Sequence, residues 1–275
     1  MRIALLYSGL PRMWRECHAT QMALFPGADI DVYFHFWDTV DAAEKCAIVE
    51  TMKPAAYLFE PPRDFGAVDR YPWLKPDNIN VPSRLISQYV SWRQVATLFQ
   101  PFAPGYGLAV RTRSDLFFFD KIKYDLANVA SGGISLVGYL WPEMPSLLSD
   151  MFAIGKPRAI VHYLSLIDFV WRYALTDFFN AETLITRHIS TMVNAGQKSF
   201  VYVMRESPFF VFRPHMAGWT PEQCRSEGPG ISKWRDPEIV AEHKRYHGQK
   251  QGPEGEAMVD AFARHQLNLA ASKST

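Results

Sequence analysis

Three charged side chains interrupt the apolar run from Leu108 to Phe119, where Arg111, Arg113 and Asp115 stand at alternating positions. Alternating positions of a strand project from one face, so we expect three charges on one side of a single strand. Desolvating an unpaired ion costs several kcal/mol or more. Such a strand is therefore expected to end at an anionic ligand or a metal ion. The alternative is an internal Arg–Asp ion-pair network that only ties the strand to its neighbours.

The chemistry of this motif suits a nucleoside diphosphate. Two guanidiniums, on Arg111 and Arg113, match phosphate or carboxylate oxygens through forked hydrogen bonds. The carboxylate of Asp115 is a hard oxygen ligand of the kind that magnesium or manganese prefers. We therefore predict a divalent metal at Asp115 beside two phosphate-binding arginines.

The first predicted strand ends in a turn that offers further ligand groups. In a parallel α/β sheet, ligands bind in the crevice outside the carboxyl ends of the strands. The run from Tyr7 through Ser8 and Gly9 to Arg12 supplies hydroxyls, backbone amides and a guanidinium at that place. Backbone amides at a helix start favour phosphate or ribose oxygens, although Gly and Pro after a strand are also ordinary turn residues.

The second strand ends in the run Phe34–Asp38, where Asp38 is a candidate for holding the nucleoside. Capping of the next helix is an equal alternative for Asp38, and His35 is interpreted as a satisfied core histidine. Arg84 and Gln88 lie one turn apart on a predicted helix and are further candidates for binding the nucleotide. An exposed helical pair with no ligand explains their spacing equally well.

Strand and helix signals alternate through the first half of the chain, which is the rhythm of βαβ units. The predicted strands are Arg2–Ser8, Asp29–Trp37, Ala55–Glu60 and Leu108–Phe119, and the predicted helices are Met13–Phe25, Asp41–Met52 and Pro82–Phe99. Strands joined by crossover helices are parallel and covered on both faces. We therefore predict a Rossmann-like three-layer α/β sandwich with a mostly parallel central sheet.

The second half mixes helices with short strands. We expect strands at Ile134–Leu140, Phe152–Ile154, Phe200–Met204 and Phe209–Arg213, and helices over Lys156–Phe179, with a break, and Ala181–Asn194. Five prolines between Pro61 and Pro82 predict a long loop. The sequence turns polar after about Glu222, so residues 1–222 are predicted to form the ligand-binding domain and residues 223–275 a polar helical appendage.

Composition excludes several classes of protein. A net charge of +1 over 275 residues does not favour a nucleic-acid partner, and three scattered cysteines fit neither disulfides nor a CxxC metal site but a reducing cytoplasm. The sequence lacks GxGxxG and P-loop motifs. No secretory signal is expected, and four charged or titratable residues within Ile160–Phe179 argue against a membrane span. Peripheral association, through the aromatic and basic residues near the C-terminus, stays open.

The element VRTRSDL resembles the Lys/Arg-x-Arg-x-Asp-Leu motif of WavE-like lipopolysaccharide-synthesis proteins and related capsule glycosyltransferases of GT-A-like fold. LLYSGLPR, FHFWD and SRLISQYVSW resemble preceding elements of that family, and SDMF and AETL its later acidic elements. The likeness covers roughly Met1 to Arg213. It implies that Asp115 occupies the place of the metal-binding Asp-x-Asp, with arginine at position 113 instead of a second aspartate. Either Asp115 then holds the ion through water, or Arg111 and Arg113 neutralise the diphosphate without metal.

The resemblance implies a cytoplasmic glycosyltransferase, which can act at the inner face of the membrane. It would move a sugar from a nucleotide-diphosphate donor to a glycan or lipid-linked acceptor in bacterial surface polysaccharide synthesis. An acceptor hydroxyl must lose a proton, and Asp150 and Glu182 are the candidate bases; the structural alternatives are a turn cap for Asp150 and a first-turn helical acid for Glu182, with His188 structural. Two other functions stay open, namely a non-catalytic nucleotide- or carbohydrate-binding protein and another group transferase such as a sulfotransferase.

Overall fold

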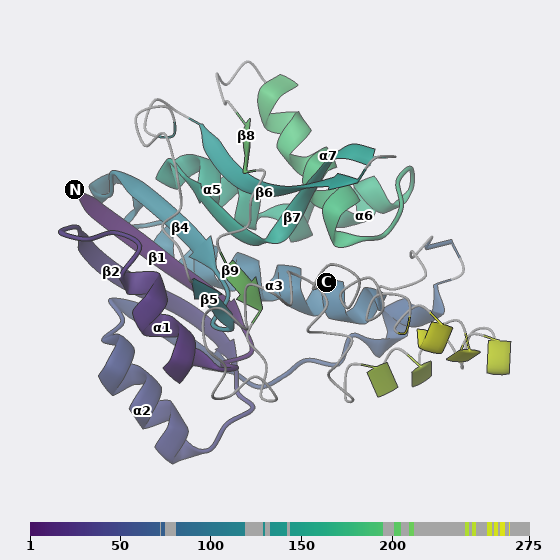
Figure 1. Ribbon diagram of the computed structural model, residues 1–275, viewed down its shortest axis with the longest axis horizontal. Helices are drawn as coiled ribbons and strands as arrows, with labels where there is room; N and C mark the ends of the chain where they lie inside the picture. The colour runs from purple at the N-terminus through teal and green to yellow at the C-terminus, as the bar shows by residue number, and fades with distance from the viewer. Residues whose placement is uncertain are drawn as a thin grey trace, which may run out of the picture.

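The computed structural model describes residues 1–71, 73–74, 81–118, 129, 133–141, 144–194, 201–204, 209–211 and scattered residues between 240 and 264. Its centre is a sheet of seven strands in the order β3-β2-β1-β4-β7-β6-β8 (Figure 1). These strands are β1 (Arg2–Gly9), β2 (Asp29–Trp37), β3 (Ala56–Glu60), β4 (Leu108–Thr112), β6 (Ile134–Trp141), β7 (Met144–Gly155) and β8 (Val201–Met204). A separate two-stranded sheet pairs β5 (Leu116–Phe118) with β9 (Phe209–Val211).

Six of the seven strands run in one direction. β3, β2, β1 and β4 are parallel neighbours, whereas β7 is antiparallel to both β4 and β6. β6 and β8 are parallel to each other, and because β6 and β4 both oppose β7, they share one direction. The carboxyl ends of β1 and β4 are therefore adjacent at the same edge of the sheet, where a ligand crevice is expected.

Helices cover both faces of this sheet, as Figure 1 shows. They are α1 (Trp14–Met22), α2 (Ala42–Met52), α3 (Pro82–Phe99), α5 (Pro157–Leu164), α6 (Val170–Ala174) and α7 (Ala181–Asn194), with the short 3-10 turns η1 (Gly66–Arg70), η2 (Ala103–Gly105) and η3 (Leu166–Asp168). Alternate residues of β1 divide between two hydrophobic cores: Ala4 and Leu6 pack on the α3 side, and Ile3 and Leu5 on the α1 and α2 side. The predicted three-layer α/β sandwich is confirmed.

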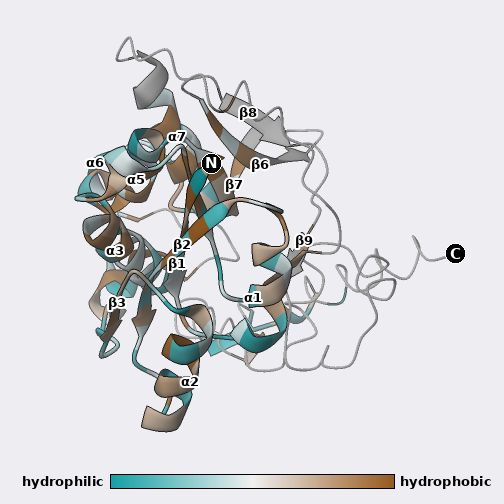
Figure 2. Cartoon of the chain, turned by 90° about the vertical axis from the view of Figure 1, so that its left-hand side faces the viewer, coloured by the Kyte–Doolittle hydropathy of each residue, from teal (hydrophilic) through white to brown (hydrophobic). Residues whose placement is uncertain are grey.

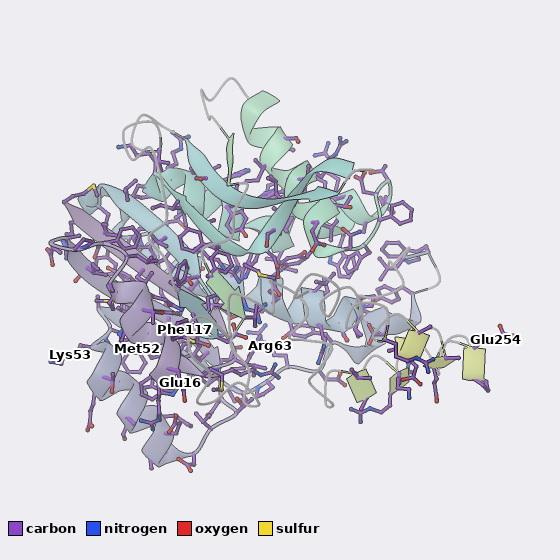
Figure 3. All side chains as sticks on the ribbon, in the orientation of Figure 1. Glu16, Met52, Lys53, Arg63, Phe117 and Glu254 are labelled. Atoms are coloured by element: carbon purple, nitrogen blue, oxygen red, sulfur yellow. The ribbon has the colours of Figure 1, made fainter. Side chains whose placement is uncertain are left out.

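Local sequence explains several helix boundaries. Asp41 Oδ1 accepts a hydrogen bond from the backbone N of Glu44 at 2.8 Å, so Asp41 and not Asp38 begins α2. Lys53, labelled in Figure 3, ends that helix in a left-handed conformation with φ of 44°. Pro82 stands in the first turn of α3, where its missing N–H costs nothing. Figure 2 shows the resulting division, with hydrophobic residues along the central strands and polar residues on the outer turns of α2.

Several sequence predictions need correction. The strand predicted over Leu108–Phe119 is broken, because residues 113–115 form a turn between β4 and β5. The short strand expected at Phe152–Ile154 is part of the twelve-residue β7. The long loop between Pro61 and Pro82 contains η1. Most of the predicted appendage lies outside the described residues, so the boundary near residue 222 stays a prediction. No helix among the described residues is both long and apolar enough to cross a membrane.

The core contains buried neutral histidines, and His188 of α7 is the clearest case. Its Nδ1 lies 3.1 Å from the Tyr173 hydroxyl, its Nε2 lies 2.8 Å from the His162 carbonyl oxygen, and its ring stacks on that of His162. Burial lowers the pKa of His188 from 6.5 to about 4, while the backbone hydrogen bond involving His162 opposes that shift. His188 is thus structural, as predicted.

This pKa predicts loss of stability in mild acid. The unfolded chain takes up a proton on His188 near pH 6.5 and the folded chain only near pH 4, so stability falls as pH drops through this window. We expect the free energy of unfolding to fall by about 2 kcal/mol between pH 7 and pH 5 from this group alone. Urea unfolding of wild type and His188→Gln at both pH values measures the difference. An equal acid dependence in the two proteins would contradict the assignment.

Candidate functional site

The turns after β1 and β4 are joined at the carboxyl edge of the sheet. Ser114 Oγ donates to the carbonyl oxygen of Leu10 at 2.8 Å. Gln21 of α1 donates from Nε2 to the carbonyl oxygens of Arg113 and Leu116, at 2.9 and 2.6 Å. Gly9 reaches the turn with φ of 108°, a conformation that residues with a side chain rarely adopt. The turn after β1 and the turn after β4, far apart in sequence, are thus held next to each other at this edge of the sheet.

Arg113 and Asp115 form a forked ion pair within the turn after β4. Arg113 Nε lies 2.8 Å from Asp115 Oδ1, and its terminal nitrogen lies 2.7 Å from Oδ2. The Arg113 side chain is 24% exposed and the Asp115 side chain 4%. The predicted row of three charges on one strand face is therefore wrong, because only Arg111 belongs to β4. The pair instead matches the alternative of an internal ion-pair network.

The described donor set does not fit a divalent metal at Asp115. Both carboxylate oxygens accept hydrogen bonds from a cation, which is the environment opposite to the one a metal ion needs. Within the described part of the chain, no three His, Cys, Asp or Glu side chains come together as a metal site would require.

Arg111 is buried on the α3 face of β4, with 1% of its surface exposed. Its guanidinium carbon lies 4.4 Å from the centre of the Trp92 ring, and one terminal nitrogen donates to the carbonyl oxygen of Asp150. Burial lowers the pKa of Arg111, although the nearby Tyr163 and Asp150 act to raise it. In this arrangement Arg111 fixes the backbone of Asp150 and does not face a ligand.

Asp150 lies on β7 close to the carboxyl end of β4. The β4–β7 ladder ends at the pair Arg111 and Ala153, three residues from Asp150 along β7, and the Asp150 carbonyl oxygen accepts a hydrogen bond from Arg111. Asp150 Oδ2 accepts a hydrogen bond from Gln88 Nε2 at 2.8 Å, and no described residue donates to its other carboxylate oxygen. A loop is expected around Asp150, where it could cap a turn, but Asp150 belongs to the strand β7. Two residues predicted separately, Gln88 and Asp150, are thus direct partners.

A layer of buried polar groups lies beside Asp150 and Arg111. Four of these groups are buried and find no hydrogen-bond partner among the described residues: the hydroxyls of Tyr89 and Tyr163, Trp92 Nε1 and Arg111 Nε. Burial raises the pKa of Tyr89 well above its usual value, and the charges of Asp150 and Glu182 raise it further. Both candidate acids therefore act electrostatically on the Tyr89 hydroxyl. Sequence reasoning missed these aromatic residues because the spacing of Tyr89 and Trp92 on α3, and the place of Tyr163 on α5, are also those of an ordinary core.

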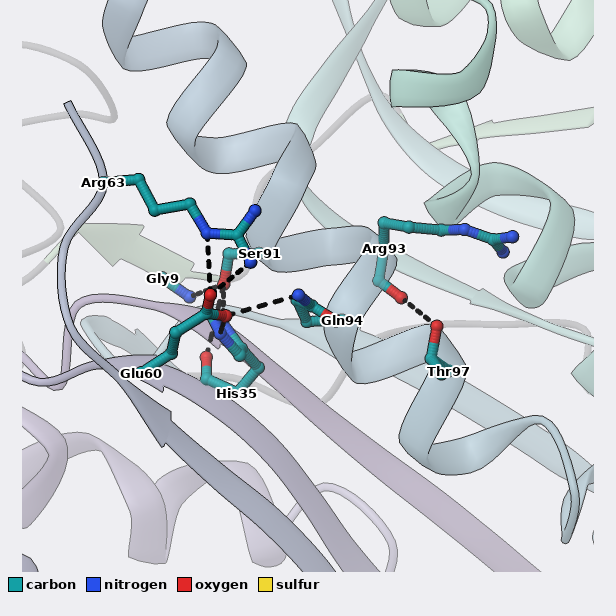
Figure 4. A network of polar contacts seen from close by, with 8 residues as sticks. All are labelled: Gly9, His35, Glu60, Arg63, Ser91, Arg93, Gln94 and Thr97. Atoms are coloured by element: carbon teal, nitrogen blue, oxygen red, sulfur yellow. Dashed lines mark hydrogen bonds and ion pairs between the residues drawn. The ribbon is translucent and has the colours of Figure 1, made fainter. Parts of the chain in front are cut away.

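A second network ties the carboxyl ends of β1, β2 and β3 to α3 (Figure 4). Gly9 N donates to Ser91 Oγ at 2.7 Å, which lies 2.7 Å from His35 Nδ1. His35 Nε2 lies 3.0 Å from Glu60 Oε2, and Arg63 also binds Glu60. An ionised Glu60 only accepts, so Nε2 carries the proton and Nδ1 accepts from the Ser91 hydroxyl. His35 is a satisfied core histidine, as predicted.

The electrostatics of this network keep His35 neutral and Glu60 charged. Burial lowers the pKa of His35, with a hydrogen bond to Glu60 acting in the opposite direction. Burial acts to raise the pKa of Glu60, but hydrogen bonds from Arg63 and His35 outweigh it and the pKa of this carboxyl is lowered. The polarity of the hydrogen-bond chain from Gly9 to Glu60 is therefore fixed near neutral pH.

The other predicted residues are divided between core and surface. The Tyr7 hydroxyl lies 2.9 Å from His18 Nδ1 inside the core, and Ser8 Oγ is buried with no hydrogen-bond partner in the described part of the chain. Arg12 is exposed at the joined turns, and Asp38 forms an ion pair with Lys45 at 2.7 Å. Arg84 is half-buried one turn before Gln88 on α3. Glu182 stands in the first turn of α7.

Comparisons with known proteins give a distant likeness only. No protein-family model matches the sequence, and no curated protein matches it. Mouse xyloside xylosyltransferase 1 in its apo form is 10% identical with a TM-score of 0.44, over 74% of this chain and 85% of that one. A "putative nucleotide-diphospho-sugar transferase" from Desulfovibrio desulfuricans G20 is 9% identical with a TM-score of 0.37, over 74% and 79%. Likeness of this degree supports no conclusion about activity.

Replacing Ser91 tests the importance of the Figure 4 network. Ser91→Ala leaves the Gly9 N–H and His35 Nδ1 buried without their partner, which costs about 1–3 kcal/mol of unfolding free energy. Thr97→Ala is the matched control, because exposed Thr97 on the same helix bonds only its own backbone turn, through the Arg93 carbonyl. Urea unfolding at pH 7 should show a loss for Ser91→Ala several times that of Thr97→Ala. Equal losses would show that the network is not an energetic constraint.

Proposed function

We propose that this protein is a glycosyltransferase that moves a sugar from a nucleoside diphosphate to an acceptor hydroxyl. The site is the joined pair of turns at the carboxyl edge of the sheet, together with Asp150. One observation carries the proposal: two guanidiniums, on Arg12 and Arg113, belong to turns that are hydrogen-bonded to each other beside a half-buried carboxylate. Cations on one side and a base on the other are what transfer from a phosphate leaving group requires.

The leaving group explains the cations. Cleaving a sugar from a nucleoside diphosphate develops negative charge on the departing phosphate. Exposed Arg12 has no ionic partner among the described residues, and Arg113 remains partly exposed behind its pair with Asp115. Arg113 would be held in place by its pair with Asp115, and the exposed Arg12 would supply the uncompensated positive charge that favours the transition state over the ground state. No metal is required for this step.

The acceptor side is assigned to Asp150. Gln88 holds one carboxylate oxygen of Asp150 and Arg111 holds its backbone, so the second oxygen is oriented without being occupied. That oxygen would take the proton from the acceptor hydroxyl as the new glycosidic bond forms. Glu182, whose charge also acts on Tyr89, is the second candidate on this side. Arg111 and Gln88 are accordingly positioning residues for Asp150.

The finer assignment follows the sequence resemblance. VRTRSDL and its companion motifs support a role in bacterial surface polysaccharide synthesis, such as lipopolysaccharide or capsule, with a glycan or lipid-linked acceptor. A cytoplasmic location would give the protein access to its nucleotide-sugar donor. Among the expected donor-binding residues, Gly9 and Ser8 lie next to the joined turns, whereas Tyr7 and Asp38 are already bonded to His18 and Lys45.

A specific observation favours a second candidate, a nucleotide-binding protein of the same fold without catalysis. Asp115 stands at the position where the resemblance implies a metal ligand, yet Arg113 occupies both of its oxygens. A chain that had lost metal-dependent chemistry would retain such a neutralised pair. Saturable binding of a nucleotide sugar with neither transfer nor hydrolysis would identify this candidate.

Donor binding is tested by thermal unfolding with UDP, GDP, CMP and dTDP, each with and without manganese. We expect one diphosphate to raise the melting temperature without manganese, since selective binding stabilises the folded state by mass action. Arg12→Gln should lower the affinity for that diphosphate at least about tenfold, because a hydrogen bond to a charged group contributes about 1.5–3 kcal/mol. Arg158→Gln, an exposed arginine on α5, is the matched control. No shift with any nucleotide, or a strict need for manganese, would count against an arginine-based site.

Asp150→Asn separates catalysis from binding. The amide keeps the shape and the partnership with Gln88 but does not accept a proton, so turnover should fall at least about a hundredfold. The melting-temperature shift caused by the diphosphate should stay unchanged. Asp29→Asn makes the same chemical change at the amino end of β2, where the Asp29 side chain is 76% exposed, and should keep full activity. Unchanged turnover in Asp150→Asn would remove Asp150 from the mechanism.

A further inference from the structure

An exposed aromatic cluster lies at the junction of α6 and the segment that follows η1. The rings of Tyr71 and Trp73 stack with centres 5.7 Å apart and planes 17° apart. Trp171 of α6 stands at a steep angle to both, with its ring centre 6.1 Å from each. The three rings belong to segments a hundred residues apart that are brought together here. Their mutual packing gives them fixed positions although they face solvent.

Two more apolar side chains continue this surface along the connection from α6 to α7. Leu175 follows Trp171 by one helical turn, and Phe178 follows three residues later. We define the α6 surface as these five residues, whose exposed fractions lie between 39% and 71%: Tyr71, Trp73, Trp171, Leu175 and Phe178. Exposed apolar groups gathered in one place mark an interaction site more often than scattered ones do.

The charges around the α6 surface are positive. Arg70 and Arg172 are exposed, each is the immediate sequence neighbour of one of its aromatic residues, and neither has an ionic partner among the described residues. Two nearby carboxylates are paired with cations, Asp168 with Arg93 at 3.4 Å and Asp177 with Arg187 at 3.8 Å, whereas Asp69, next to Arg70, accepts hydrogen bonds from Ser83. An apolar centre with uncompensated guanidiniums at its rim is complementary to an anionic partner with an apolar interior.

We infer that the α6 surface docks on the interface of an anionic lipid bilayer. Tryptophan and tyrosine suit the headgroup level because each combines an apolar ring with a polar tip. Leu175, the most exposed of the five at 71%, offers no ring and no polar group to a sugar but inserts readily among acyl chains. Arg70 and Arg172 would meet lipid phosphates. Attachment of this kind is peripheral and needs no membrane-spanning helix.

The docking surface is connected to the candidate site through α3. Asp69 of η1 accepts hydrogen bonds from the backbone N and the hydroxyl of Ser83, each at 2.8 Å, so the aromatic segment is fastened to the first turn of α3. Gln88, the partner of Asp150, is five residues further along, which is about 7.5 Å of helix rise. Docking would therefore bring the acceptor side of the site close to the lipid surface. This last link, to a lipid-linked acceptor, rests on the proposed function; the docking itself does not.

Co-sedimentation with lipid vesicles tests the inference. The full-length protein should bind phosphatidylcholine vesicles that contain phosphatidylglycerol, and salt or removal of the anionic lipid should weaken binding. The double variant Trp73→Ser, Leu175→Ser should lower the partition coefficient at least about fivefold, and Arg70→Gln, Arg172→Gln should abolish the preference for anionic lipid. Tyr57→Ser, Phe102→Ser, which changes two equally exposed aromatic residues on β3 and after α3, should bind as wild type does.

Several outcomes would overturn the inference. These are no binding of wild type to anionic vesicles, equal loss in the control variant, or quenching of Trp73 and Trp171 fluorescence by soluble oligosaccharides with no response to vesicles. The last result would identify a glycan-binding surface instead. The diphosphate-induced shift in melting temperature is measured on the same proteins. The absence of that shift in wild type would contradict the proposed transferase. Vesicle binding would still show whether the α6 surface docks on anionic lipid.

Discussion

A fully buried guanidinium must be surrounded by acceptors and ring faces, and Arg111 imposes this requirement on the centre of the molecule. Trp92 supplies the ring and the Asp150 carbonyl supplies the acceptor. β4 and β7 pair directly over only three residues, Ala109 to Arg111. The Arg111 bond extends their connection beyond that ladder and fixes where β7 passes the end of β4. This contact holds the backbone of Asp150, while Gln88 holds its side chain, and together they set the geometry of the candidate site.

The two arginines of the VRTRSD motif therefore have different environments although they are two residues apart. Arg111 belongs to a strand inside the sandwich, and its charge is balanced by internal groups. Arg113 belongs to a turn at the sheet edge, and its charge is balanced by the buried carboxylate of Asp115 in the same turn. The strand ends between them because the turn backbone bonds to α1 through Gln21 and to the turn after β1 through Ser114. A single charged motif thus places one arginine in the core and the other in the turn at the edge of the sheet.

The sequence predicted the architecture well because apolar periodicity reports burial directly. Strand and helix alternation in the first half gave the layers and the parallel direction of β1 to β4. The same periodicity failed at residues 113–115, because charged residues at alternating positions fit a strand and a tight turn equally well. Asp38 and Asp41 are both plausible caps by residue type, and only the helix geometry selects Asp41.

Hydrogen bonds between segments far apart in the chain could not be predicted from the sequence. Gln88 and Asp150 were each identified as polar residues in promising places, yet their hydrogen bond depends on the register of an antiparallel strand that local patterns do not encode. Ser91 and Glu60 were missed because a serine inside a helix and a glutamate at a strand end are unremarkable alone. They matter only because β2 brings His35 between them.

Helix α3 carries four of the attachments described above on a single rigid rod. Ser83 holds the segment after η1, Gln88 holds Asp150, Ser91 holds the end of β1, and Trp92 holds Arg111. Each attachment requires its side chain to point in its own direction, and one added residue turns everything beyond it by about 100°. The length of α3 between Ser83 and Trp92 is consequently intolerant of insertions and deletions, so related chains should vary here by substitution alone and differ in length only in the flanking loops.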